Sequence, residues 1–229
     1  MDDSPYSLIP DILTAENIFL SIGQKDILKG VTIRAEKGKI TGLLGRNGSG
    51  KSTMMQSIFG TRKADECDIF INGVMVKQPY CVNGLVNYLP QQNFLPQDMS
   101  LKRIARDFKI TPLDILEYFP EIEENMNKKI GELSGGIERL FSVMILLLAD
   151  TRFTFLDEPF SHIMPLHVAQ IQKLLLQQKQ KKGIIITDHL YKALLPISDY
   201  LFLMKDGKTI FIKDRNDLVL HGYINQYQE

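Results

Sequence analysis

The sequence predicts an α/β fold in which helices cover both faces of a mainly parallel β-sheet. Two observations support this prediction. Short apolar, β-like runs alternate with helix-like segments along the chain, a pattern typical of parallel sheets. In addition, the stretch GLLGRNGSGKSTMMQSIFG joins a strand-like run to a helix-like run through three closely spaced glycines, Gly45, Gly48 and Gly50.

The first part of the chain predicts an N-terminal antiparallel β-subdomain that leads into a buried strand. We expect strands over 16–22, 31–35 and 39–44, since turn-forming glycines separate these runs. A helix over 51–59 follows and ends at Gly60. A hairpin over 68–77 is expected because Asn72-Gly73 is a strong turn signal.

The second part predicts a small helical subdomain followed by the rest of the sheet. Residues 99–127 have helical spacing, many charges and no convincing strand. The other expected elements are helices over 137–149 and 166–182, strands over 153–156 and 184–187, and a hairpin of 200–204 with 209–213. We therefore expect a single domain, 1–229, with a core (1–92 and 150–229) and a helical subdomain (about 93–149).

Composition excludes several classes of protein. The 27 basic and 27 acidic residues balance, which argues against a general attraction to nucleic acid, so we expect no nucleic-acid partner. Cys67 and Cys81 fit neither a metal site nor a disulfide framework. The longest apolar run, 143–149, is far shorter than the roughly 20 residues of a membrane span, and MDDSPYSLIPD is no signal peptide. Membrane work would therefore require another chain to supply the spans.

The glycine-rich stretch matches the phosphate-binding pattern G-x-x-x-x-G-K-[ST] in full. Its glycines let successive N–H groups turn inward, and the following helix adds its positive N-terminal end. Lys51 would reach the β- and γ-phosphates, and Ser52 would complete a Mg²⁺ shell. The alternative, a flexible glycine turn, is disfavoured by the strand–helix context. The candidate residues are Gly45, Arg46, Asn47, Gly48, Ser49, Gly50, Lys51, Ser52 and Thr53.

Two carboxylates end a buried strand in the stretch FTFLDEP, residues 153–159. Ligands bind at the carboxyl ends of strands in open α/β sheets. Asp157 can hold Mg²⁺ through water, and Glu158 can polarise an attacking water. An acidic pair after a strand is weak evidence alone, but beside a complete phosphate loop it indicates a hydrolytic site.

A second candidate anion site, Leu133-Ser134-Gly135-Gly136, precedes a predicted helix. Because one phosphate loop already serves one nucleotide, the economical explanation is that Ser134, Gly135 and Gly136 grip a nucleotide held by another copy of the chain. The alternative is an N-capping serine with two loop glycines.

Together these motifs resemble the nucleotide-binding subunit of ATP-binding cassette (ABC) transporters over nearly all of the chain. The resemblance implies a P-loop NTPase (RecA-like) core and a helical subdomain that carries the signature. In the family's order, the motifs are the Walker A loop (45–53), a Q-loop (88–91), the LSGG signature (133–136), Walker B (153–159) and a switch histidine, His189. Gln91 is the expected Q-loop glutamine, with Gln92 as the alternative.

The resemblance implies an ATP sandwich of two copies facing head to tail, expected to be a homodimer. One phosphate loop would hold ATP·Mg²⁺, and the other copy's signature would close on the γ-phosphate. Ser52, Gln91 and Asp157 would serve the metal, while Glu158 would act as base and His189 would contact the γ-phosphate. It also implies membrane-spanning transporter subunits as partners, and a cytoplasmic, peripheral location on the inner face of the cell membrane.

Three positions depart from the family pattern. Ile22 stands where an aromatic ring usually stacks on adenine, and Phe19 or Tyr6 could replace that ring. Ile137 follows the signature glycines where glutamine is usual, and Met164 replaces an aspartate that crosses between subunits. Since the charged catalytic groups remain, we still expect an active ATPase.

The leading hypothesis is an ATPase subunit that energises transport of an unspecified substrate. The alternatives are an ABC ATPase acting on a cytosolic complex, for example in iron–sulfur assembly, and a nucleotide-binding scaffold without turnover. The stretch 93–107 allows two interpretations, a docking surface for membrane partners or ordinary subdomain core. The apolar residues concerned are Phe94, Leu95, Met99, Leu101 and Ile104.

Overall fold

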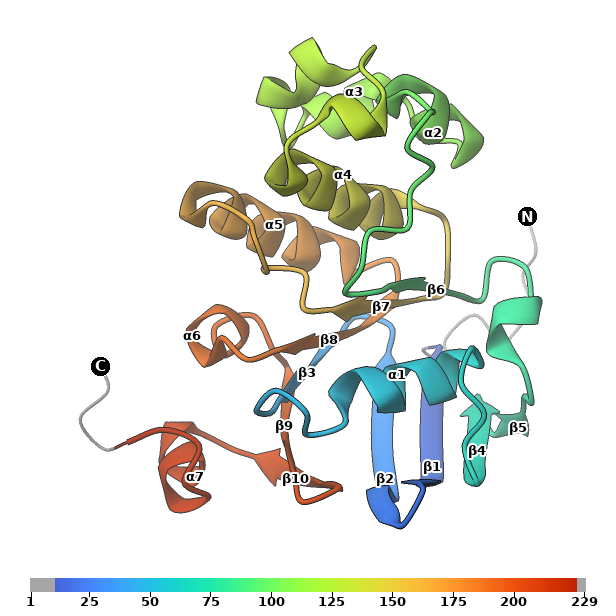
Figure 1. The fold of residues 1–229 in the computed structure, drawn as a ribbon, viewed down its shortest axis with the longest axis vertical. Helices are drawn as coiled ribbons and strands as arrows, with labels where there is room; N and C mark the ends of the chain where they lie inside the picture. Colours follow the sequence, from blue (N-terminus) through green and yellow to red (C-terminus); the bar gives the residue numbers. More distant parts are fainter. Residues whose placement is uncertain (1–10, 226–229) are drawn as a thin grey trace.

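The computed structural model describes residues 11–225, which form two sheets with helices packed mainly on the larger one (Figure 1). The larger sheet has six strands in the order β10-β9-β3-β8-β7-β6, and the smaller has four in the order β2-β1-β4-β5. The strands are β1 (Ile12–Ile22), β2 (Lys25–Glu36), β3 (Ile40–Leu44), β4 (Glu66–Ile71), β5 (Val74–Met75), β6 (Val86–Leu89), β7 (Phe153–Asp157), β8 (Gly183–Asp188), β9 (Tyr200–Lys205) and β10 (Lys208–Ile212).

The helices lie mostly between the strands in sequence. They are α1 (Lys51–Phe59), α2 (Leu101–Asp107), α3 (Pro112–Leu116), α4 (Gly135–Leu148), α5 (Pro165–Gln178), α6 (Tyr191–Leu194) and α7 (Arg215–Leu220), with 3-10 turns at Pro79–Cys81, Pro120–Asn125 and Ile130–Glu132. In the large sheet β3, β6, β7, β8 and β9 run parallel, and β10 pairs antiparallel with β9. The small sheet is antiparallel. The predicted fold class is confirmed.

The two faces of the large sheet pack against different partners because successive side chains of a strand point to opposite sides. Leu43 and Phe155 join the apolar cluster that contains α1 and the small sheet. Leu44, Leu156 and Ile186 join the cluster that contains α4 and α5. Helix α1 therefore lies between the two sheets, whereas α4 and α5 cover the other face, as Figure 1 shows.

The segment between β6 and β7 is helical, as the sequence predicted. Helices α2 and α3 stack beyond α4 with the 3-10 turns Pro120–Asn125 and Ile130–Glu132, at the end of the molecule away from the small sheet (Figure 1). Leu95, Leu101 and Ile104 are buried, whereas Phe94 is 37% exposed. Most of the apolar residues in 93–107 are thus subdomain core, and a docking surface formed by all of them is excluded.

Some elements differ from the sequence-based expectation. Strand β6 was not predicted, since it is a four-residue edge strand with only Leu89 fully buried. Strands β1 and β2 are longer than expected, at 11 and 12 residues, because exposed polar residues such as Lys25 and Lys29 obscure the alternation. Within residues 11–225, no helix is both long and apolar enough to cross a bilayer.

Lys182 is a buried lysine just before β8. It is 2% exposed, and its ammonium donates to the Ala149 carbonyl. Burial lowers the pKa of Lys182 to about 8; Asp150 acts against this shift and Lys181 adds to it. The ordinary lysine pKa is 10.5. Between these values the unfolded chain binds more protons than the folded chain, so the contribution of Lys182 to stability rises with pH.

We predict that the free energy of unfolding of the wild-type protein, minus that of Lys182→Met, rises between about pH 8 and pH 10.5. Urea titrations followed by circular dichroism measure both values, and groups common to the two proteins cancel in the difference. A difference that stays constant over this interval would contradict the burial of a titrating ammonium.

Candidate functional site

Three motifs meet at one edge of the large sheet because three parallel strands end there. In the strand register Leu44 of β3 is paired with Asp188 of β8, and Asp157 of β7 is paired with Thr187 of β8. The phosphate loop follows β3, Glu158 follows β7 and the switch histidine follows β8. The carboxyl edge of the sheet is where ligands bind in such folds.

The loop between β3 and α1 has the geometry of an anion site. Gly48 and Gly50 adopt positive φ values of 78° and 106°, which side chains with a Cβ rarely adopt. Gly50 is the N-cap of α1, and no side chain caps the helix there. The first N–H groups of α1 therefore lack a side-chain acceptor, and a helix N-terminus of this kind suits a phosphate.

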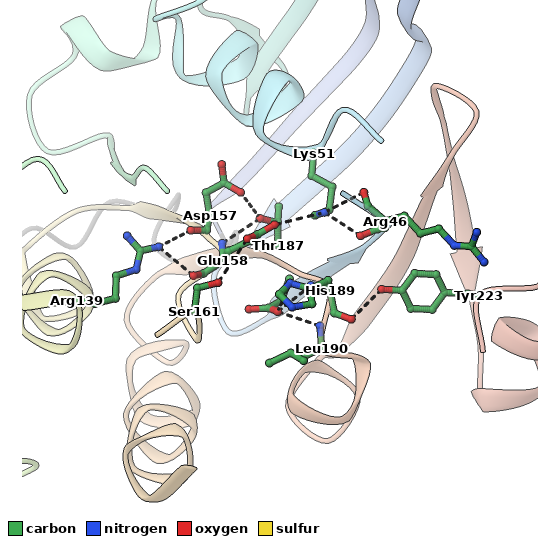
Figure 2. Close-up of polar contacts among 12 residues, drawn as sticks. Arg46, Lys51, Arg139, Asp157, Glu158, Ser161, Thr187, His189, Leu190 and Tyr223 are labelled. Atoms are coloured by element: carbon green, nitrogen blue, oxygen red, sulfur yellow. Dashed lines mark hydrogen bonds and ion pairs between the residues drawn. The ribbon is translucent and has the colours of Figure 1, made fainter. Parts of the chain in front are cut away.

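Lys51 connects the phosphate loop with the end of β7. Its side chain is 4% exposed, and Nζ donates to the Gly45 carbonyl at 2.8 Å. Nζ also lies 3.7 Å from Oε1 of Glu158, as Figure 2 shows. The lysine and the glutamate thus form an ion pair within the site.

A pocket of about 450 Å³ lies over the loop. Most of the predicted loop residues line it, together with the Q-loop glutamine and the Walker B glutamate. The lining residues are Ile22, Ile27, Asn47, Gly48, Ser49, Gly50, Lys51, Ser52, Thr53, Gln91 and Glu158. Gln91 rather than Gln92 lines this pocket, and its role as the Q-loop glutamine stays a prediction. The pocket combines backbone N–H groups and an ammonium with a carboxylate, which suits a nucleotide and an attacking water.

Asp157 is fully buried behind the pocket and is not part of its wall. The Thr187 hydroxyl donates to Oδ1 at 2.6 Å, and the Tyr88 hydroxyl donates to Oδ2 at 3.1 Å. Burial raises the pKa of Tyr88, and the charge of Asp157 and the hydrogen bond to it act in the same direction. The Tyr88 hydroxyl therefore keeps its proton, and the two hydroxyl donors fix the orientation of the carboxylate.

The oxygen donors at the site fit Mg²⁺, which prefers hard oxygen ligands and keeps several waters. The Ser52 hydroxyl and the Gln91 amide line the pocket, and the Asp157 carboxylate lies behind it. Residues 11–225 contain no group of three or more His, Cys, Asp or Glu side chains placed to hold a metal. A Mg²⁺ ion here would thus need phosphate oxygens and water to complete its shell.

Glu158 has an unusual backbone that directs its side chain. Its φ is +49°, in the left-handed region that is uncommon for residues other than glycine and that concentrates at functional sites. The backbone N–H donates to the Thr187 carbonyl at 2.9 Å, and the Ser161 hydroxyl lies 3.4 Å from Oε2. Neighbouring strands and Ser161 thus hold the glutamate in a defined position.

Arg139 of α4 is a structural centre of the site that sequence reasoning missed. It is 4% exposed and donates to three carbonyls: Pro90 at 2.6 Å, Asp157 at 2.6 Å and Glu158 at 3.0 Å (Figure 2 draws the last two). Burial lowers the pKa of Arg139, and Asp157 and Glu158 oppose this shift. The sequence feature that could have identified Arg139 is its place as an arginine within a strongly apolar helix.

The switch histidine lies next to the loop but lines a different pocket. The His189 side chain is 43% exposed and shares its pocket with Arg46 and Asn47. Oδ1 of the buried Asp188 accepts the N–H groups of His189 and Leu190 at 2.8 and 2.9 Å and lies 3.4 Å from Nδ1 of the imidazole. Burial raises the pKa of Asp188, while these backbone hydrogen bonds act in the opposite direction. Asp188 therefore holds the backbone N–H groups of His189 and of the residue that follows it.

The signature residues lie away from the pocket of their own chain. Ser134 is the N-cap of α4, with its hydroxyl 3.4 Å from the Ile137 nitrogen, and Gly135 and Gly136 begin the helix. None of the three lines the pocket over the phosphate loop. Ser134 is thus an N-cap as the alternative expected, although both glycines belong to the helix rather than to a loop. The role of these residues toward a second copy stays a prediction.

The position of the missing aromatic ring is occupied by aliphatic side chains. Ile22 is 52% exposed and lines the pocket together with Ile27. Phe19 packs over Gly30 instead, where its ring leaves no room for a Cβ, and it does not line the pocket. Tyr6 lies outside the described residues. Phe19 is therefore wrong as the substitute ring.

Comparison with known proteins agrees with this geometry. The ABC transporter family model matches residues 28–161. The lipopolysaccharide export system ATP-binding protein LptB of Haemophilus influenzae is 30% identical over 216 residues, covering 87% of this chain and 89% of the relative. The corresponding protein of Acidithiobacillus ferridurans is 28% identical over 235 residues, covering 94% of this chain and 95% of the relative.

Solved structures give the same result. The ADP conformation of an ATP-binding cassette of an ABC transporter has a TM-score of 0.71 and 27% identity, covering 92% of this chain and 95% of that chain. The fold and site thus define an ATP-binding cassette. This chain belongs to the ABC transporter family and is an ATP-binding protein of that family.

We predict that Arg139→Lys lowers the free energy of unfolding by about 1–3 kcal/mol, because a single ammonium cannot bond three carbonyls from the guanidinium's positions. Urea unfolding measures the loss. Arg103→Lys, an exposed change on α2, is the matched control and should shift stability by less than about 0.5 kcal/mol. Equal effects of the two changes would show that Arg139 does not brace the site.

Proposed function

We propose that this chain hydrolyses ATP and thereby drives transport of a substrate through separate membrane-spanning subunits. The single observation that carries the proposal is the shared pocket. It brings the phosphate loop, Gln91 and Glu158 together, with Glu158 paired to Lys51 at 3.7 Å. An anion nest, a cation and a carboxylate in one pocket are the groups that transfer of a phosphoryl group to water requires.

In the proposed mechanism, the loop N–H groups and Lys51 hold the ATP phosphates. Ser52 and Gln91, with Asp157 acting through water, would hold Mg²⁺, which offsets the negative charge on the phosphate oxygens when bound. Asp157 keeps its orientation because both of its oxygens accept hydroxyl hydrogen bonds. In this proposal the oriented carboxylate of Asp157 faces the metal's water shell.

Glu158 acts as the base in this proposal. It accepts a proton from the water that attacks the γ-phosphorus, the bond between that phosphorus and the β,γ-bridging oxygen breaks, and ADP and phosphate result. Arg139 and Ser161 hold the glutamate's backbone and side chain, so the base does not need to reorganise during the step. His189 contacts the γ-phosphate from the neighbouring pocket.

We also propose that two copies form the ATP sandwich. Gly135 has open space beside it, and the signature lies outside its own chain's pocket, so it is free to close on a nucleotide held by a second copy. In the same proposal, residues of about 93–149 form the helical subdomain, and 1–92 with 150–229 form the core.

Closure of the two copies on ATP, followed by reopening after hydrolysis, would move the membrane subunits.

The relatives support transport as the purpose of this cycle. Their names describe lipopolysaccharide export, branched-chain amino acid transport and petrobactin import. Because these substrates differ, the proposal includes transport but no substrate. It places the chain on the inner face of the cell membrane, bound to membrane-spanning partners.

The test of the transport proposal is mass spectrometry of the proteins that co-purify with the tagged chain from detergent-solubilised native membranes. We expect a polytopic membrane protein in stoichiometric amount. Purification of the same tag without the chain is the control. A stoichiometric complex without any polytopic protein would contradict transport and leave only the ATPase proposal.

The aliphatic wall of the pocket gives a further prediction. Ile22→Tyr restores a ring beside the nucleotide base, so ATP should bind more tightly, by up to about tenfold in Kd. Isothermal titration calorimetry measures the change. Val74→Tyr, an exposed position on β5, is the control and should leave the affinity unaltered. An unchanged ATP affinity in Ile22→Tyr would show that the absence of an aromatic ring at position 22 does not weaken ATP binding.

A further inference from the structure

The segment that follows α7 forms hydrogen bonds with the site at three successive residues, 221–223. Lys205 donates to the His221 carbonyl at 2.9 Å, and Arg46 of the phosphate loop donates to the Gly222 carbonyl at 3.2 Å. The Tyr223 hydroxyl donates to the carbonyl of His189 at 2.9 Å, as Figure 2 shows. This segment therefore contacts both the phosphate loop and the switch loop.

Tyr223 is anchored from within its own segment. Its backbone N–H donates to the Leu218 carbonyl at 2.8 Å, and both Leu218 of α7 and the adjacent Ile224 are buried in the apolar core. Burial raises the pKa of the Tyr223 hydroxyl, and the backbone of Gly45 partly offsets that rise. The hydroxyl is consequently protonated and available as a donor.

With the hydrogen bond from Tyr223, both backbone groups of His189 have a side-chain partner. Asp188 accepts the His189 N–H, and Tyr223 donates to the His189 carbonyl, so side chains hold both backbone groups of this residue. Its imidazole is 43% exposed, so packing alone does not fix the direction of the ring. The direction of the ring therefore depends on the backbone that carries it.

We propose that Tyr223 is a positioning residue for the ATPase reaction. Its hydroxyl holds the His189 backbone so that the imidazole faces the γ-phosphate, and the Arg46–Gly222 contact ties this arrangement to the phosphate loop. The inference rests on the proposed function and extends it to a residue outside the five sequence motifs.

The first test is steady-state ATP hydrolysis by Tyr223→Phe, which removes only the hydroxyl. We expect kcat to fall about two- to tenfold, the effect of one lost hydrogen bond, with little change in KM. Tyr200→Phe is the matched control, because Tyr200 lies on β9 and its hydroxyl has no hydrogen-bond partner among residues 11–225. Thermal unfolding of each variant checks that it is folded. An unchanged kcat in Tyr223→Phe would overturn the proposal.

A double-mutant cycle with His189→Ala separates positioning from general stabilisation. If Tyr223 acts through the imidazole, Tyr223→Phe should have no further effect on kcat once His189 is alanine. An equal loss in both backgrounds would show that Tyr223 does not act through His189. That result would leave the proposed hydrolysis intact.

Side-chain NMR of the four histidines gives a readout that does not depend on turnover. The His189 imidazole signal, assigned from its loss in His189→Ala, should shift in Tyr223→Phe and stay in place in Tyr200→Phe. An unmoved signal in Tyr223→Phe would overturn the proposal even if the wild-type protein did not hydrolyse ATP. Absence of hydrolysis alone would instead contradict the proposed function.

Discussion

The register between β3, β7 and β8 is the constraint on which the site depends. Because these buried parallel strands are paired in register, the phosphate loop, Glu158 and His189 begin at adjacent points of one sheet edge. A shift of a single residue would move every side chain of a strand to the opposite face. Successive side chains of these strands pack alternately against α1 on one face and against α4 and α5 on the other, so such a shift would exchange the side chains of two packed clusters. The core therefore specifies the geometry of the site.

Beyond the strand ends, buried and half-buried polar side chains hold the backbone of the loops. Arg139 bonds carbonyls from two loops, and Tyr223 bonds the carbonyl of the switch residue. Each contact satisfies groups that would be costly to leave unpaired inside the protein. The same contacts connect α4 and the segment after α7 to the pocket, so distant parts of the chain help to orient the reacting groups.

The sequence predicted the parts of the site that depend on local pattern. The phosphate loop has a fixed spacing, and β3, β7 and β8 are continuous apolar runs, so both could be recognised without a structure. Strand β6 was missed because it is short and only partly buried at the sheet edge. Arg139 and Tyr223 were missed because they bond backbone carbonyls far away in sequence, and a carbonyl has no signature in the sequence.

The most direct test of the central claim compares phosphate release from ATP by the wild-type chain and by Glu158→Gln, with calorimetry to measure ATP binding. Lys51→Ala, which should abolish binding, serves as the negative control. If Glu158 is the base in the pocket that Lys51 shares, the Gln variant should bind ATP as the wild type does and release phosphate at least about 100-fold more slowly. Equal rates of release in the two proteins would contradict the account.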